Sequence, residues 1–325
     1  MKAEAVLIVG LTRTSGSVGL ALRAADLGWS ISAFDPNEET AERAKELGLV
    51  DDLVSDVRKA MDAADLLILD LPPQGLETAL TIAGQRLSDH GLVVDLSRPK
   101  QMGLELAQQY LARGHYVGAS PALAAERLTD AETDLSGARA DLFRDSVICL
   151  MADESVESEA VRTAVRLGQL LGAKPFFVAA REYDSLTAGT NVAPGLLAAA
   201  LFKALTAAEG WRDMRRFAGT PFAMGTAGLE DETLARQVLT ERAATLRWLD
   251  AVRAELDQVR ALLIEGDEER LTPILRDLRL QRQAWLEQRK DNVWLDHLDE
   301  GVSPLSLRQL LLGGLFSKSD DEPGS

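Results

Sequence analysis

The chain has 325 residues, 46% of them hydrophobic and 26% charged, as in globular proteins long enough for two domains with separate cores. Its net charge of −16 disfavours nucleic-acid and anionic membrane partners, because both are themselves negatively charged. The single cysteine, Cys149, excludes a disulfide framework, and its apolar surroundings indicate a core side chain. The first strand begins near the amino terminus and the longest apolar run, 192–202, is too short to cross a bilayer. We therefore expect a cytoplasmic protein without a secretory signal or a membrane span, and no metal site.

The amino-terminal residues 5–35 have the pattern of a dinucleotide-binding βαβ unit. A continuous apolar run predicts a strand that is buried on both faces, and helical spacing then predicts a helix closed by a glycine. A second apolar run predicts another strand, which ends in an acidic residue. In chain order these features are the strand 6–11, the helix 17–27 with Gly28, the strand 31–34 and Asp35. Together they indicate a Rossmann-type unit.

The glycine fingerprint of such units, G-x-G-x-x-G/A, is incomplete here, since Gly10, Thr12 and Ser15 occupy its three positions. Thr12 adds a side chain where the backbone normally approaches the pyrophosphate, whereas Ser15 is small and is followed by Gly16. Two interpretations of this turn stay open. Its hydroxyls and guanidinium hold phosphate in place of glycine amides, or it is a polar surface turn at a site that has lost its ligand.

Asp35 favours NAD over NADP, because an acid at this position binds the ribose diol and no basic residue follows it. The alternative role of Asp35 is that of a turn residue at a helix entry. The residues predicted to hold the cofactor are Gly10, Thr12, Arg13, Thr14, Ser15, Gly16, Asp35, Leu71, Pro72 and Ser97.

Strands and helices alternate through the next part of the chain, which predicts a doubly wound, mostly parallel sheet over residues 1–180. The expected strands are 66–71, 92–95, 116–120, 147–151 and 174–178. The expected helices are 37–47, 56–64, 74–87, 100–112 and 156–171. The fold class is therefore α/β, with a Rossmann-type nucleotide-binding domain at the amino terminus.

Strand signals end at residue 181, and residues 181–290 are predicted to form an all-α domain. Its Ala- and Leu-rich segment 196–208 suggests a helix buried on nearly all sides, and 230–264 shows long helical periodicity that 272–288 repeats. So much apolar surface favours burial against a second copy, so we expect a homodimer through this domain. Residues 291–325 are expected to contain a short apolar helix over 306–316 and a disordered acidic tail.

Seven sequence runs together resemble the prephenate dehydrogenase family, including its arogenate-using relatives. They are VLIVGL, SGSVGLAL, VVDLSRPK, YVGASPALAAE, GARADLFRDSVICL, YDSLTAGTNVAPGLLAAAL and GWRDMRRFA. The resemblance implies a Rossmann domain followed by a helical dimerisation domain. It also implies an enzyme that oxidises a small cyclohexadienyl carboxylate with NAD(P) and releases carbon dioxide, in tyrosine biosynthesis.

The two histidines that the resemblance assigns to the active site are absent. Ser120 replaces the histidine that accepts a proton while hydride leaves, and an unactivated serine is a far weaker base. Val192 replaces the histidine that holds the ring hydroxyl, with Asn191 in place of a neighbouring serine. Arg98 replaces a further serine, while Lys100 is retained.

Other positions of the family's site survive, and the resemblance gives them roles. Glu126 follows the serine that replaces the first histidine, and Arg212 and Arg216 belong to a run whose guanidinium groups suit a substrate carboxylate. Their alternative roles are an exposed loop acid and a salt-bridged helix surface. The predicted catalytic residues are Ser120, Glu126 and Lys100. The predicted substrate ligands are Arg98, Asn191, Val192, Arg212 and Arg216.

The three histidines of the chain, His90, His115 and His297, are not expected to replace the lost base. His90 and His115 each precede a strand, whereas the chemistry of doubly wound sheets lies at the carboxyl ends of strands. Three functional hypotheses stay open. They are an NAD-dependent dehydrogenase of the prephenate and arogenate type, a dehydrogenase for a different hydroxy acid, and a family member without catalysis that serves as a ligand-binding or regulatory dimer.

Overall fold

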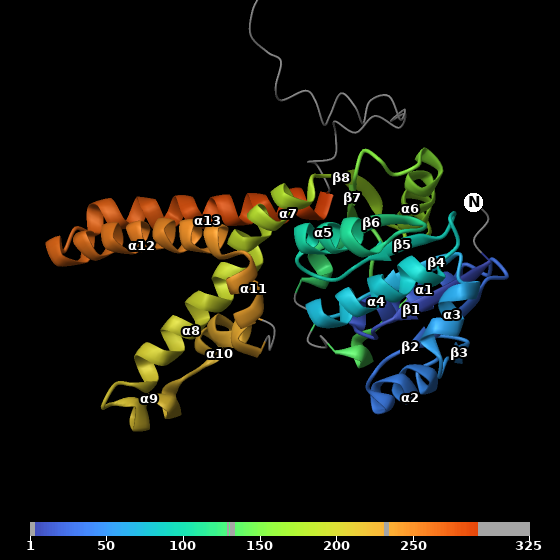
Figure 1. Cartoon of the computed structure of the whole chain (residues 1–325). Helices are drawn as coiled ribbons and strands as arrows, with labels where there is room; N and C mark the ends of the chain where they lie inside the picture. Colours follow the sequence, from blue (N-terminus) through green and yellow to red (C-terminus); the bar gives the residue numbers. More distant parts are fainter. Residues whose placement is uncertain (1–3, 129, 131–133, 231–233, 292–325) are drawn as a thin grey trace, which may run out of the picture. The chain divides into compact units, whose positions relative to one another are not determined.

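The computed structural model describes residues 4–128, 130, 134–230 and 234–291 (Figure 1). The chain divides into two compact units, Met1–Asp277 and Leu278–Ser325. All the elements discussed below as parts of the site lie in the first unit. The helix expected over 306–316 and the acidic tail fall outside the described residues.

Eight strands form one sheet in the order β3-β2-β1-β4-β5-β6-β7-β8. The strands are β1 (Ala5–Val9), β2 (Ser30–Phe34), β3 (Asp52–Leu53), β4 (Leu66–Leu69), β5 (Leu92–Asp95), β6 (His115–Ala122), β7 (Val147–Ala152) and β8 (Lys174–Phe177). Every neighbouring pair is parallel except β6 and β7, which run antiparallel. The predicted doubly wound, mostly parallel sheet is confirmed, and its first six strands have the Rossmann order.

Several details of the sheet differ from the sequence expectation. Strands β1 and β4 end two residues earlier than expected, at Val9 and Leu69. The short edge strand β3 was not predicted, because two residues are too few to show a pattern. Strand β6 does not end before Pro121, which pairs with Ile148 of β7. Proline lacks only the N–H donor, so its carbonyl can still take part in an antiparallel ladder.

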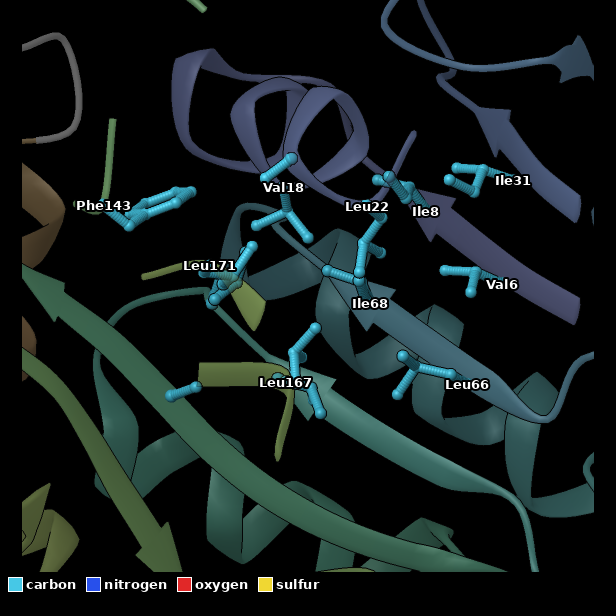
Figure 2. Close-up of a cluster of buried hydrophobic side chains, with 14 of the residues drawn as sticks. Val6, Ile8, Val18, Leu22, Ile31, Leu66, Ile68, Phe143, Leu167 and Leu171 are labelled. Carbon is cyan, nitrogen blue, oxygen red and sulfur yellow. The ribbon is translucent and has the colours of Figure 1, made fainter. Parts of the chain in front are cut away.

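Both faces of the sheet are buried, as the continuous apolar runs predicted. In β1, Val6 and Ile8 face one core, and Leu7 and Val9 face the other. Figure 2 shows the first core, where Val18 and Leu22 of one helix and Leu167 of another meet the strands. The helices over this face are α1 (Arg13–Ala24), α2 (Glu38–Glu46) and α6 (Ser158–Leu170), and those over the other face are α3 (Val57–Ala63), α4 (Pro73–Arg86) and α5 (Lys100–Tyr110).

Helix α1 begins earlier than its apolar spacing predicted. It starts at Arg13 instead of residue 17, because Thr12 caps it, and it ends at Ala24. Gly28 has the expected left-handed conformation, with φ of +70°, but it lies beyond the helix end instead of closing it. The polar turn expected over residues 12–15 is therefore the first turn of this helix.

The rest of the first unit is helical, as predicted. Its elements are α7 (Ala180–Thr187), the π-helical turn η3 (Ala188–Val192), α8 (Ala193–Thr206), α9 (Trp211–Phe217), α10 (Thr220–Thr226), α11 (Leu234–Thr240) and α12 (Arg242–Glu265); α13 (Glu268–Asp291) crosses into the second unit. The single helix suggested by the periodicity of 230–264 is two helices separated at Glu241.

The prediction that the segment 196–208 is buried on nearly all sides is wrong for the single chain. Only Ala193, Gly195 and Ala198 of α8 are buried, while Leu201 is 43% exposed. An Ala- and Leu-rich composition indicates a helix with a large apolar surface. It does not indicate whether the same chain or another molecule buries that surface.

The continuous helix Ala180–Thr206 is the one described segment whose length and composition would allow a membrane span. This finding goes beyond the expectation from the apolar run 192–202, because α7 and η3 extend α8 without a break. Core helices of soluble proteins pass the same test.

Candidate functional site

The carboxyl ends of the central strands form the edge where doubly wound sheets bind their ligands. The strand order reverses between β1 and β4, on either side of Gly10 and Asp70. Gly10 has φ of +88°, and a Cβ atom there would lie 2.2 Å from the carbonyl oxygen of Asp70. Only glycine fits this position. Gly16 lies close to the side chain of Leu49, since a Cβ atom there would lie 2.9 Å from Leu49 Cδ1.

Thr12 and Ser15 form a reciprocal cap at the start of α1. Thr12 Oγ1 accepts hydrogen bonds from the amides of Thr14 at 3.0 Å and Ser15 at 3.3 Å. Ser15 Oγ accepts from the Thr12 amide at 2.9 Å and donates to the Gly10 carbonyl at 2.8 Å. Two amides of the first turn are therefore bonded within the protein, where a phosphate would otherwise find free donors.

The same threonine is linked to the adjacent strand. Thr12 Oγ1 donates a hydrogen bond of 2.5 Å to Asp70 Oδ2. Burial raises the pKa of Asp70, and the hydrogen bond from Thr12 opposes that rise by favouring the charged carboxylate. The residue in place of the second fingerprint glycine is thus bonded to its own helix and to the end of β4.

The guanidinium of Arg13 is engaged by protein groups and is not free to bind a phosphate. Its guanidinium contacts the carboxylate of Asp130, and its Nε donates to the Gly137 carbonyl at 3.2 Å. Only 12% of the side chain is exposed. In this arrangement the guanidinium connects Asp130 and Gly137 to the start of α1.

Asp35 lies at the end of β2, where the βαβ pattern placed it. Its Oδ2 accepts from the Leu11 amide at 2.7 Å, and its Oδ1 accepts from the Asn37 amide at 2.8 Å. Each carboxylate oxygen can accept a further hydrogen bond. On the neighbouring loops, the Leu71 amide donates to Ser97 Oγ at 2.9 Å, and Pro72 precedes the first residue of α4.

Three features of this edge are suited to binding a dinucleotide, and one feature is unfavourable for binding its pyrophosphate. Gly10 keeps the turn free of side-chain bulk, Gly16 keeps the first turn of α1 close to Leu49, and Asp35 retains acceptor capacity for a ribose diol. Thr12 is the restriction, because its hydroxyl occupies the Thr14 and Ser15 amides.

A small pocket, partly open to solvent, includes the loop that follows β5. It brings together three of the predicted substrate ligands, Arg98, Asn191 and Val192. Its wall also includes residues that the sequence analysis missed. The lining consists of Arg98, Pro99, Tyr183, Asp184, Thr187, Asn191, Val192, Gln237 and Glu241. The π-helical turn η3 supplies two of them, and such turns are frequent at functional sites.

Ser120 and Tyr183 form a hydroxyl pair at the position where the resemblance places a histidine. Ser120 Oγ lies 2.6 Å from the Tyr183 phenol oxygen, and Ser120 is only 1% exposed. Burial raises the pKa of Tyr183, while the positive charge of Arg98 and the hydrogen bond to Ser120 oppose the rise. A pair of hydroxyls therefore lies at the position for which the resemblance implies an imidazole.

Lys100 is only 1% exposed. Its Nζ donates to the Asp95 carbonyl at 2.9 Å, and its amide donates to Asp184 Oδ1 at 2.9 Å. Asp184 Oδ2 accepts from the Gln101 amide at 2.7 Å, so this carboxylate caps α5 from another helix. Burial lowers the pKa of Lys100 to about 8, against the opposing effect of Asp95.

Glu241 is the pocket's second carboxylate and stands at the junction of α11 and α12. Burial raises its pKa, and the charge of Asp184 raises it further. Helix α12 is fixed to α7 by the bond from Trp248 Nε1 to the Ser185 carbonyl, 3.2 Å long. Tyr183 and Asp184 begin one of the sequence runs that carry the resemblance, but neither they nor Glu241 were assigned to the site, because only the packing of α12 against α7 brings them to one wall.

Residues 18–176 match the family model described as prephenate dehydrogenase, nucleotide-binding domain. The prephenate dehydrogenase of Bacillus subtilis (strain 168) is 25% identical to the chain over 284 residues, which are 82% of this chain and 72% of that protein. The nucleotide-binding part of the chain, residues 18–176, therefore belongs to the prephenate dehydrogenase family.

Solved structures of this family share the fold. Prephenate dehydrogenase from A. aeolicus, in complex with hydroxyphenyl propionate and NAD+, superimposes with a TM-score of 0.78 at 20% identity, covering 87% of this chain and 99% of that one. Synechocystis arogenate dehydrogenase gives a TM-score of 0.70 at 22% identity, covering 86% and 99%. The sheet order and the helical region are thus those of prephenate dehydrogenase structures.

Five residues with expected roles in the prephenate dehydrogenase family do not line the pocket. Two of them, Ser120 and Lys100, are buried. Glu126 is exposed on a short 3₁₀ turn, Ala125–Arg127. Arg212 and Arg216 are exposed on α9, and Arg216 lies 3.6 Å from Asp213 in a surface ion pair. Helix α8 has 14 residues and is therefore roughly 21 Å long, which separates α9 from Val192 in the same chain.

The described histidines also lie outside the pocket. His115 is the first residue of β6, at the amino end of the strand, and its Nε2 is 3.5 Å from Glu157. His90 is exposed in the turn before β5. His297 falls outside the described residues.

Proposed function

We propose that this chain is a nicotinamide-dependent dehydrogenase that oxidises and decarboxylates a cyclohexadienyl carboxylic acid, as the names of its relatives suggest. The observation that carries the proposal is the pocket. It places Arg98, Asn191 and Val192 beside Tyr183, at the ligand-binding edge of a nucleotide-binding domain. Tyr183 in turn contacts Ser120, which replaces the family's proton-accepting histidine.

Gly10, the start of α1 and Asp35 would hold the dinucleotide, with Leu71, Pro72 and Ser97 on the neighbouring loops. When bound, the nicotinamide accepts the hydride. Asp35 favours NAD over NADP, because no basic residue of the Pro36-Asn37 turn is available for an additional phosphate. The affinity for the pyrophosphate is lowered, because the amides of Thr14 and Ser15 must give up their hydrogen bonds to Thr12 Oγ1 before they can donate to a phosphate.

Tyr183 would handle the proton of the substrate hydroxyl. As the C–H bond yields its electron pair, the phenolate form of Tyr183 takes the hydroxyl proton, and Ser120 donates a hydrogen bond to the phenol oxygen. The bond to the ring carboxylate then breaks, its electrons enter the ring, carbon dioxide leaves, and the proton returns to the ring oxygen. The guanidinium of Arg98 favours the phenolate and is suited to a substrate carboxylate.

Further parts of the proposal concern the assembly. The apolar side chains exposed on the helical region suit a homodimer, and Arg212 or Arg216 would reach a substrate carboxylate only from a partner subunit. Lys100 would position the loop after β5 and not contact the substrate, because it is buried under that loop. Glu126 has no described contact with the pocket. A cytoplasmic location fits these roles.

Calorimetric titration with NAD, NADH and NADP tests the proposal. We expect binding of NAD and NADH, and weaker binding of NADP. The absence of heat with all three at millimolar concentration would contradict both dehydrogenase hypotheses.

One observation favours a second candidate function, that of a ligand-binding dimer without catalysis. The pKa of Tyr183 is raised by burial, so the phenolate is scarce at neutral pH. A third possibility is a dehydrogenase that oxidises a different hydroxy acid. Turnover assays with prephenate and arogenate separate these possibilities.

A further inference from the structure

A carboxylate of the protein lies at the amino end of helix α1, where a dinucleotide would place its pyrophosphate. Asp70 directly follows β4, and its amide donates to the Val9 carbonyl at 3.0 Å, so the residue lies beside the turn that begins at Gly10. Its Oδ2 accepts the 2.5 Å hydrogen bond from Thr12 Oγ1. Helix amino ends bind anions through their free amides and the helix dipole. In this structure the anionic group at that position belongs to the chain itself.

The hydrogen bonds around Asp70 are those of an acceptor. Thr12 Oγ1 accepts from the amides of Thr14 and Ser15, so its own hydrogen is directed to the carboxylate. Burial raises the pKa of Asp70, but hydrogen bonds from Thr12 and from the Ser15 amide oppose that rise because they favour the charged form. The first turn of α1 therefore already holds a carboxylate on the groups that would otherwise meet a phosphate.

Two cations near this edge are bonded to other groups. Lys100 lowers the pKa of Asp70 through its charge and Asp95 raises it, but Lys100 Nζ donates its hydrogen bond to the Asp95 carbonyl. The guanidinium of Arg13 contacts the carboxylate of Asp130. A pyrophosphate that entered this turn would bring its negative charges next to the Asp70 carboxylate, and the Coulomb repulsion would oppose its binding.

We propose that Asp70 competes with the cofactor's pyrophosphate for the amino end of α1 and thereby sets the affinity of the protein for its dinucleotide. The carboxylate must move away from Thr12 before a phosphate can reach the amides of the first helical turn. Asp70 is a specificity-determining residue and not a catalytic one, because it acts on the binding of a phosphate group. The inference rests on the proposed function for the assignment of this edge to a dinucleotide.

Calorimetric titration of the full-length protein and of Asp70→Asn tests the inference with two probes, NAD and ADP-ribose. Asparagine keeps the size of the side chain and one acceptor oxygen for Thr12, and it removes the charge. We expect the variant to bind both probes at least about tenfold more tightly, the scale of one charge-assisted hydrogen bond. ADP-ribose contains the pyrophosphate without the nicotinamide, so an equal gain with both probes places the effect at the pyrophosphate.

Two further variants protect the test against a change that merely loosens the turn. Asp70→Ala removes the acceptor together with the charge and is expected to bind both probes more tightly than the natural protein does. Asp65→Asn is the matched control, because Asp65 precedes the same strand at its other end and also accepts amides, those of Glu4 and Ala5. We expect this control to leave both affinities unchanged.

Unchanged or weaker binding in both Asp70 variants, a gain with NAD but not with ADP-ribose, or an equal gain in Asp65→Asn would overturn the inference. If the natural protein binds NAD and transfers hydride while the Asp70 variants show no gain, this inference alone is contradicted. Binding of NAD by Asp70→Asn but not by the natural protein at millimolar concentration supports the inference and contradicts the proposed function. No binding by any of the proteins contradicts both.

Discussion

Tyr183 gives the proposed reaction a distinctive pH dependence. A histidine base is largely deprotonated above pH 7, so its contribution becomes constant, whereas a tyrosine with a raised pKa gains phenolate as the pH rises. Below that pKa the phenolate fraction grows about tenfold per pH unit. We therefore expect kcat/KM with saturating NAD to rise by about this factor per unit between pH 7 and pH 9.

The matched variant for this prediction is Tyr183→Phe, which removes the phenol oxygen and leaves the ring. We expect the rise with pH to disappear, together with most of the activity, while the calorimetric affinity for NAD stays unchanged. A wild-type profile that is flat above pH 7 would show that another group takes the proton.

Lys100 makes a separate contribution, to stability. Its pKa in the folded protein is about 8, below the unfolded value of 10.5. Between these two pH values the unfolded chain binds more protons than the folded one, so this group makes the protein more stable as the pH rises. The effect amounts to at most about 3 kcal/mol of unfolding free energy.

Urea denaturation of the natural protein and of Lys100→Met, at pH values from 7 to 10, measures this effect. We expect the free energy of unfolding of the natural protein to increase relative to the variant across that range. The comparison with the variant cancels other titrating groups, such as Tyr116, whose pKa burial raises well above 10. A difference that stays constant with pH would mean that Lys100 titrates normally.

At the scale of the element, Thr12 stabilises helix α1 as its cap and occupies the amides that would bind a phosphate. Thr12→Gly restores the second fingerprint glycine and frees the amides of Thr14 and Ser15. We expect tighter NAD binding, by calorimetry, together with a loss of a few tenths of a kcal/mol in stability, because glycine replaces a threonine cap at about that cost.

Asp56→Gly is the control, since Asp56 caps α3 in the same way by accepting from the Arg58 and Lys59 amides. It is expected to reduce stability without changing cofactor affinity. If Thr12→Gly left the affinity for NAD unchanged or lowered it, the hydroxyl would be part of the cofactor site and not a restriction on it.

The elements also show what a sequence can reveal. Strand β5 was predicted at its observed bounds, because a strand covered on both faces needs an uninterrupted apolar run. Helix α8 was misjudged, because composition does not distinguish a core from a surface that a partner can cover. The resemblance led to Ser120, Arg98 and Val192, but their neighbour Tyr183 is 63 residues from Ser120 in the chain. No spacing rule connects such residues before the helices pack.

For the whole molecule, the main prediction concerns the assembly. Exposed apolar side chains recur on the helical region, among them Leu201, Phe217, Met224, Leu239 and Leu256. Leu201→Glu places a charge on α8 and is expected to convert a dimer into monomers, as measured by light scattering after size-exclusion chromatography.

Leu27→Glu is the control for that substitution, because Leu27 is similarly exposed, at 36%, but lies at the end of α1. It is expected to leave the mass unchanged. A natural protein that is monomeric at micromolar concentration would contradict the proposed dimer and would leave the exposed apolar residues of α8 without an explanation.

The central claim is that a prephenate dehydrogenase fold without its two histidines still transfers hydride. The most direct measurement is the absorbance at 340 nm of the full-length protein at pH 9 with NAD and either arogenate or prephenate, beside Tyr183→Phe. The account predicts NADH formation with at least one of the two substrates and its near loss in the variant. No NADH from either substrate, or equal rates for the natural protein and Tyr183→Phe, would contradict it.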